Sequence, residues 1–83
     1  MREVILVSAP WCSVCKSMEE WFFDIEIPGV KFRLWSAEEI EENISTVPTI
    51  LFRENGRTVQ TVPGAMAKYA LVSLIRSVWP EGR

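Results

Sequence analysis

The chain has 83 residues, of which 48% are hydrophobic and 24% charged, and its formal net charge is −2. This length accommodates one domain, residues 1–83, and the hydrophobic content excludes intrinsic disorder. Interspersed charges argue against nucleic-acid binding, and no apolar run approaches the roughly 18 residues that span a bilayer. The apolar residues 4–7 are too few for a signal peptide. We therefore expect a cytoplasmic protein that binds neither nucleic acid nor membrane.

The first half of the chain predicts a strand, a helix and a second strand. Residues 4–7 form an unbroken, mostly β-branched run, which is typical of a central strand buried on both faces. Residues 12–23 place apolar side chains at helical spacing. After the Pro28-Gly29 break, apolar and polar residues alternate over residues 30–35 and predict a second strand.

The second half predicts a helix, a hairpin and a last helix. Ser36 and Glu39 have capping-box spacing and predict a short helix. Asn55-Gly56 predicts a tight hairpin between strands at residues 49–53 and 57–62. The last helix is expected from about residue 65 to residue 78. The apolar stripe of the short helix would comprise Ala37, Ile40 and Ile44.

This order of elements, βαβαββα, predicts an α/β fold. A right-handed crossover makes the first two strands parallel. The hairpin then adds two antiparallel strands. We expect a four-stranded mixed sheet with the first strand inside it and helices on both faces.

Cys12 and Cys15, the two cysteines of the chain, indicate chemistry more than scaffolding. A disulfide framework needs more cysteines spread further apart, and a ring of about four residues would stabilise the fold by only ~2 kcal/mol. The chain has no histidine, and a closed zinc site needs four ligands, so no metal is expected. Two unreactive buried thiols remain the structural alternative.

The position of the pair favours a reactive thiolate. Cys12 and Cys15 are expected in the first turn of a helix, where residues three apart share a face. Unpaired backbone N–H groups and the helix dipole favour an anion there, and the thiolate is the nucleophilic form of cysteine. Cys12 follows Trp11 in the loop and is the expected nucleophile. Cys15 lies on the apolar stripe and is the expected resolving thiol.

Several segments resemble the thioredoxin family. Residues 11–16, Trp-Cys-Ser-Val-Cys-Lys, are similar to its active-site motif, and residues 47–49 resemble its cis-proline followed by a core strand. Residues 52–56 resemble its Phe-x-x-Gly hairpin, and Gly64-Ala65 resembles the pair that precedes its last helix. The similarity starts at Val4 and covers nearly the whole chain.

The resemblance implies a thioredoxin-like fold and a dithiol–disulfide oxidoreductase. Cys12 would attack a substrate disulfide, and Cys15 would release the reduced product and leave the pair oxidised. The redox disulfide would be the sole reactive group, with no bound cofactor. The implied partners are disulfide-containing proteins and a reductant, either thioredoxin reductase or glutathione. A monomer is expected.

The resemblance also implies a substrate groove. Pro48 would be cis and lie against the cysteines, and the exposed backbone of Val47 would pair with an extended substrate segment, as in strand addition. The other residues expected to bind substrate are Trp11, Ser13, Val14, Pro63 and Gly64.

The chain departs from the family at two places and leaves alternatives open. Leu6 stands where thioredoxins usually carry a buried Asp, and residues 4–11 contain no acid. The dipeptide between the cysteines is Ser-Val, which differs from those of thioredoxins and glutaredoxins. One alternative is a glutaredoxin-like protein coupled to glutathione or to thioredoxin reductase, although the glutathione-binding Gly-Gly-x-x-Asp does not follow Pro63. A binding module with a structural disulfide is the other.

Overall fold

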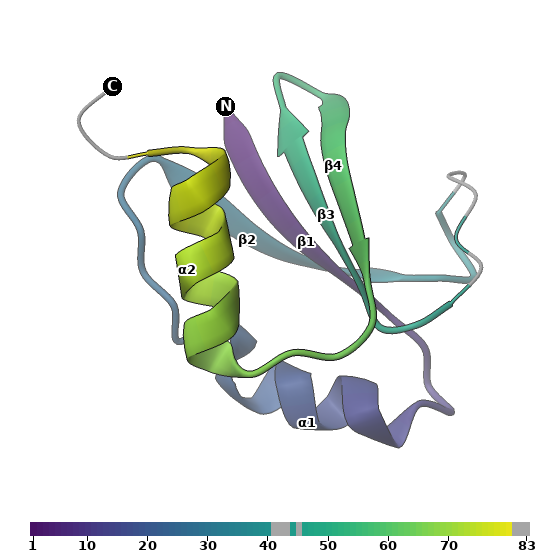
Figure 1. Cartoon of the computed structure of the whole chain (residues 1–83). Helices are drawn as coiled ribbons and strands as arrows, with labels where there is room; N and C mark the ends of the chain where they lie inside the picture. The colour runs from purple at the N-terminus through teal and green to yellow at the C-terminus, as the bar shows by residue number, and fades with distance from the viewer. Residues whose placement is uncertain (41–43, 45, 81–83) are drawn as a thin grey trace.

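Four strands form one mixed sheet in the computed structural model, which describes residues 1–40, 44 and 46–80. The strand order is β2-β1-β3-β4, in which β1 runs parallel to β2 and antiparallel to β3, and β4 is antiparallel to β3 (Figure 1). The predicted mixed sheet, with the first strand inside it, is confirmed. The elements are β1 (Arg2–Ser8), α1 (Ser13–Phe22), β2 (Val30–Ser36), β3 (Thr49–Glu54), β4 (Arg57–Pro63) and α2 (Lys68–Val78).

Strand β1 is the buried centre of the sheet. The side chains of residues 4–7 are all 0% exposed, as their unbroken apolar run predicts. Val4 and Leu6 point to one face, and Ile5 and Val7 point to the other, because successive side chains of a strand alternate. The end of β1 is therefore anchored on both faces, and the loop that follows it starts from a fixed point.

Both described helices pack on the same face of the sheet (Figure 1). Met18 and Phe22 of α1 and Leu71 and Ile75 of α2 share one core cluster with residues of β1 and β3. Burial of these side chains supplies most of the driving force for the packing, at about 1.5–3 kcal/mol for each large side chain. The cluster fixes α1, and with it the cysteine pair, against the sheet.

The opposite face is covered by the segment after β2. The predicted stripe of Ala37, Ile40 and Ile44 packs there against the second core cluster. Residues 37–39 form a turn in which the Glu38 N–H donates to Ser36 Oγ at 3.2 Å. The rest of the helix predicted from Ser36, residues 41–43 and 45, lies outside the described residues, so within the described ranges helices cover one face only.

Helix α2 begins later than predicted. Lys68 is its first residue, whereas the apolar pattern placed the start near residue 65. Ala67 has extended backbone and, with only a methyl side chain, makes no capping hydrogen bond. The chain leaves β4 through Gly64 at a φ of +97°, so the segment before Lys68 continues in a non-helical direction.

The predicted hairpin is confirmed. Asn55 and Gly56 both have positive φ, 54° and 83°, as a tight two-residue turn between twisted strands requires. This turn, together with a one-residue register shift between Phe52 and Arg53, places Thr49, at the start of β3, opposite Pro63, at the end of β4. Within the described residues, no helix is both long and apolar enough to cross a membrane.

Candidate active site

Cys12 and Cys15 form a disulfide between the end of β1 and the first turn of α1, with their Cα atoms 5.3 Å apart. Cys12 is the N-cap residue and has extended backbone, with φ −105° and ψ 104°. Its N–H donates to Ala9 O at 3.2 Å, and its carbonyl accepts from Lys16 N–H at 3.3 Å. The tight turn after β1 thus places Cys12 Sγ at the N-terminus of α1.

The two cysteines differ in exposure. Cys12 is 9% exposed and Cys15 is 0% exposed, so an attacking group reaches Cys12 first. The Cys15 N–H donates to Cys12 Sγ at 3.1 Å, so a sulfur occupies the place of a capping oxygen. A thiolate at Cys12 would gain from this N–H and from the helix dipole. The first turn of α1 holds no acidic residue to oppose that charge.

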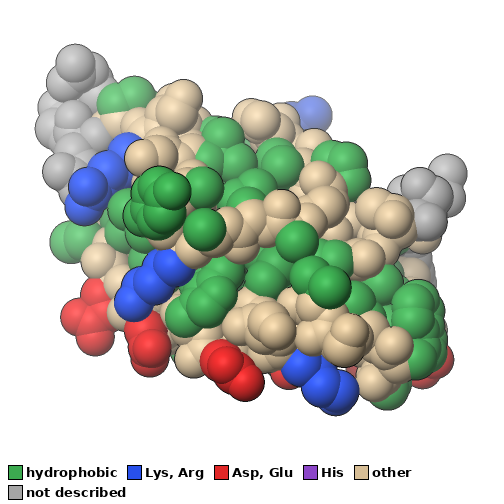
Figure 2. Space-filling view, turned by 60° about the horizontal axis from the view of Figure 1, so that its bottom comes forward, with side chains coloured by type: hydrophobic (Ala, Val, Ile, Leu, Met, Phe, Trp, Pro, Cys, Tyr) green, Lys and Arg blue, Asp and Glu red, His purple; other side chains and the backbone are tan. Residues whose placement is uncertain are grey.

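Two large apolar side chains next to the cysteines in the chain are exposed. Trp11 is 73% exposed and Val14 is 47% exposed, although both are large hydrophobic residues. Ser13, the first residue of α1, is also exposed. Figure 2, which brings the lower end of Figure 1 forward, shows apolar side chains spread over this face and acidic side chains along its lower margin. Exposed aromatic and aliphatic groups next to a reactive centre are typical of a docking surface.

The segment before β3 reaches the cysteines. Val47 packs against Ala9, Cys12 and Cys15. The Val47–Pro48 peptide bond is cis, the geometry that the resemblance implies. The Pro48 side chain is buried, and its carbonyl accepts the Gly64 N–H at 2.8 Å.

Two of the remaining expected groove residues come from the end of β4. Pro63, which is exposed, pairs with Thr49, and Gly64 is half-buried. The hydrogen bond from Gly64 to Pro48 joins this end of β4 to the segment that contacts the cysteines. The structure therefore brings the expected groove residues from three separate segments to one end of the sheet.

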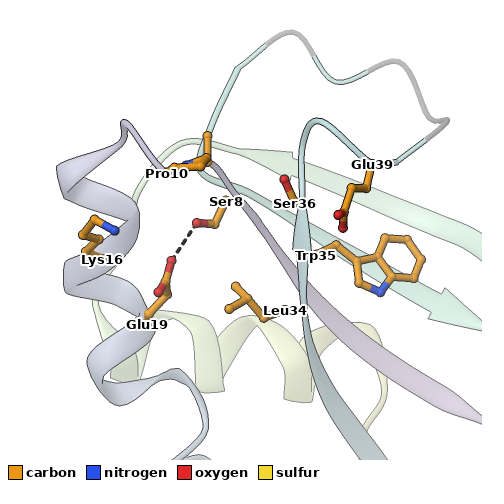
Figure 3. A pocket seen from close by; sticks show the side chains of 9 residues that line it. Ser8, Pro10, Lys16, Glu19, Leu34, Trp35, Ser36 and Glu39 are labelled. Atoms are coloured by element: carbon orange, nitrogen blue, oxygen red, sulfur yellow. Dashed lines mark hydrogen bonds between the residues drawn. The ribbon is translucent and has the colours of Figure 1, made fainter.

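A cavity of about 290 Å3 lies on the other side of β1, against β2 (Figure 3). Inside it Ser8 Oγ, at the end of β1, donates to Glu19 Oε2 of α1 at 2.6 Å. Sequence reasoning missed both residues. The available signal was the spacing of Glu19, four residues after Cys15 and so on the same side of the helix. The cavity is lined by Ser8, Ala9, Pro10, Lys16, Glu19, Leu34, Trp35, Ser36 and Glu39.

The site contains no metal centre among the residues that the structure describes. No group of three or more His, Cys, Asp or Glu side chains lies close enough there to hold an ion.

The chain is similar in sequence to known proteins. A family model described as Thioredoxin matches residues 2–77. The putative thioredoxin H10 of Arabidopsis thaliana is 35% identical, over 75% of this chain and 45% of the plant protein. Thioredoxin H8 of the same plant is 32% identical, over 74% of this chain and 46% of that protein. Human Glutaredoxin-3 is 36% identical, over 71% of this chain and 20% of the human protein.

The chain spans about half the length of the plant relatives that it matches. A solved structure of a thioredoxin variant from Halobacterium salinarum superposes with a TM-score of 0.80. It covers 92% of this chain and 73% of the archaeal one at 23% identity, a likeness that shows the fold.

Proposed function

Because the chain belongs to the thioredoxin family, we propose that it is a dithiol–disulfide oxidoreductase that reduces disulfides in other proteins. The observation that carries this proposal is the Cys12–Cys15 pair at the N-terminus of α1, in which the first cysteine is 9% exposed and the second is 0% exposed. A structural crosslink over so short a ring adds at most about 2 kcal/mol. The exposed apolar side chains of Trp11 and Val14 beside the pair support the binding of another molecule there.

In the proposed reaction the Cys12 thiolate attacks one sulfur of the substrate disulfide. A Cys12–substrate bond forms, the substrate bond breaks, and the other substrate sulfur leaves as a thiolate. The Cys15 thiolate then attacks Cys12 Sγ, which forms the intramolecular disulfide and releases the second substrate thiolate. Two electrons pass from the pair to the substrate. The Cys15 N–H, 3.1 Å from Cys12 Sγ, is placed to stabilise negative charge on that sulfur.

The groove residues are proposed to hold an extended segment of the substrate. The Val47 backbone would pair with it, since strand addition supplies main-chain hydrogen bonds independent of sequence. Val47 itself packs against Cys12 and Cys15. Apolar contacts would come from Trp11, Val14, Pro63 and Gly64, and Ser13 would offer its hydroxyl.

A reductant must return two electrons to the pair after each turnover. We assign this step to a reductase such as thioredoxin reductase, with glutathione as the alternative, and place the protein in a reducing compartment such as the cytoplasm. Measuring turnover with glutathione and, separately, with NADPH and thioredoxin reductase decides between the two reductants. Activity with glutathione alone would assign a glutaredoxin-like role.

Insulin reduction with dithiothreitol tests the proposal. Wild-type protein should accelerate precipitation of the insulin B chain, whereas Cys12→Ser should match the uncatalysed rate. Cys15→Ser should accumulate a mixed disulfide that mass spectrometry detects. Ser17→Ala, an exposed change on the same helix, serves as the matched control and should behave as wild type. If wild type and Cys12→Ser give the same rate, the proposal is wrong.

The binding-module alternative predicts a different reduction potential. A structural disulfide in this position should resist cytosolic reductants and have a potential below about −300 mV. Equilibration of the protein in thiol–disulfide buffers, followed by tryptophan fluorescence, measures that potential. A value within the range of glutathione or thioredoxin supports the oxidoreductase.

A further inference from the structure

In the resolving step the Cys15 thiol must lose its proton, and the expected groove residues include no carboxylate that could accept it. Cys15 is 0% exposed, yet it must be a thiolate to attack Cys12. A thiol with an ordinary pKa of ~8.5 is only about 3% ionised at neutral pH. A substrate that covers Trp11 and Val14 would close the way to water on that side. The Cys15 proton therefore needs an acceptor inside the protein and another route out.

Glu19 is placed to be that acceptor. It lies four residues after Cys15 on α1, and side chains at this spacing have Cβ atoms about 5–6 Å apart. Its carboxylate accepts the Ser8 hydroxyl at 2.6 Å, which turns it toward the sheet (Figure 3). Ser8 is 7% exposed and precedes Ala9, which packs against Cys15. A carboxylate is thus held on the buried side of α1, next to the residues that enclose the sulfur.

The cavity that Glu19 lines lies on the β2 side of β1. Its walls include Leu34, Trp35 and Ser36 of β2, whereas Val47 and Gly64 lie by β3 and β4. The strand order places β2 and β3 on opposite sides of β1. A substrate bound in the groove would leave this cavity in contact with water.

Resting on the proposed function, we propose that Glu19 accepts the Cys15 proton during the resolving step and passes it to water through the cavity. Cys15–SH loses its proton to the Glu19 carboxylate, and the resulting thiolate attacks Cys12 Sγ. The Cys12–Cys15 bond forms, the Cys12–substrate bond breaks, and the substrate sulfur leaves with the electron pair. The departing thiolate takes a proton from water, and Glu19 returns its own to water.

Two other charged side chains face the cavity through which the proton would leave. Lys16 of α1 and Glu39, which follows β2, line the same cavity, while β1 contributes the neutral Ser8 hydroxyl and α2 contributes no residue to it. Lys16 stands three residues before Glu19 on α1.

The test separates the two chemical steps with dithiobis(nitrobenzoate), from which each attack releases one coloured thiolate. Cys12 attack gives the first release, and Cys15 attack gives the second. Glu19→Gln is the informative variant, because its amide oxygen still accepts the Ser8 hydrogen bond but cannot take a proton. The exposed neighbour Glu20→Gln is the matched control, with the same loss of charge.

We expect Glu19→Gln to slow the second release and leave the first unchanged. Without an internal acceptor the rate follows the thiolate fraction, which falls from about one half at pH ~8.5 to about 1% at pH ~6.5, roughly 50-fold. In wild type and Glu20→Gln, the rate of the second release should fall much less over that pH range. The first release, measured in the Cys15→Ser background, should be equal with and without Glu19→Gln.

Superimposable pH profiles for wild type and Glu19→Gln would overturn the inference, as would equal slowing of both releases, which marks a structural role. Urea unfolding of each variant checks that the fold is retained. Failure of the wild type to reduce insulin would instead contradict the proposed function, whatever the pH profile of Glu19→Gln.

Discussion

Replacing Gly64 by alanine should disturb the groove without touching the cysteines. Gly64 has a φ of +97°, which side chains other than glycine rarely adopt. A Cβ built there meets no atom within 4 Å, so the substitution introduces no steric clash. The effect of Gly64→Ala is therefore a backbone effect, and its size can be worked out from the conformation alone.

The expected cost is about 1–2 kcal/mol if the chain keeps its positive φ. If the backbone rotates to relieve that strain, the Gly64 N–H moves away from Pro48 O, its acceptor at 2.8 Å, and a hydrogen bond of about 1 kcal/mol is lost. Both outcomes destabilise the protein. Rotation also loosens the link to the segment that contacts the cysteines, which should raise KM for a protein substrate roughly two- to tenfold.

Gly29→Ala is the matched control. Gly29 also has positive φ, +82°, and open space around its Cα, but it lies in the turn before β2. Urea unfolding should show a similar loss of unfolding free energy for both variants. Insulin reduction should show a raised KM for Gly64→Ala alone. D-Alanine at position 64, introduced by chemical synthesis, favours positive φ and should recover most of the lost stability.

Two results would refute this reasoning. The first is a Gly64→Ala protein as stable as wild type, because strain at a positive φ would then not matter here. The second is an equal rise in KM for Gly29→Ala and Gly64→Ala, because the effect would then follow global stability and not the bond to Pro48.

Three further predictions follow from burial. Trp11→Ala should raise KM for protein substrates and change the unfolding free energy by less than about 0.5 kcal/mol, since Trp11 is 73% exposed; a loss above 1–2 kcal/mol would contradict a surface role. Leu71→Ala should cost about 2–5 kcal/mol in urea unfolding, since Leu71 is 0% exposed in the main core. In the reduced protein, iodoacetamide should modify Cys12, 9% exposed, before Cys15, 0% exposed; mass spectrometry of the peptides would reveal the reverse order.

Local patterns predicted most of the fold correctly. The apolar run of residues 4–7 indicated a strand buried on both faces, and Asn55-Gly56 indicated the hairpin turn that the structure contains. These signals depend on neighbours a few residues apart, so they can be read from the chain. The start of α2 was predicted about three residues early, because Ala65, Met66 and Ala67 suit a helix but offer no cap.

The two sulfurs of the site were also predictable. Their spacing and their place between a strand and a helix indicated both the pairing and the deeper position of Cys15. The environment of Glu19 was not predictable from the sequence. In the sequence it is one of several acidic residues, and only its spacing of four residues from Cys15 distinguishes it from Glu20. Its hydrogen bond to Ser8 exists because α1 packs across the end of β1.

By itself, the sequence determined the order of the four strands and the two described helices, the hairpin and the cysteine pair, because each depends on periodicity or turn chemistry within a short stretch of chain. Only the tertiary structure decided what surrounds the pair. Val47 reaches Cys12 because β3 lies beside β1, and Gly64 reaches Pro48 because the hairpin register places β4 beside β3. Strand order and register bring together residues that are far apart in the chain. No local sequence pattern indicates which of these residues come into contact.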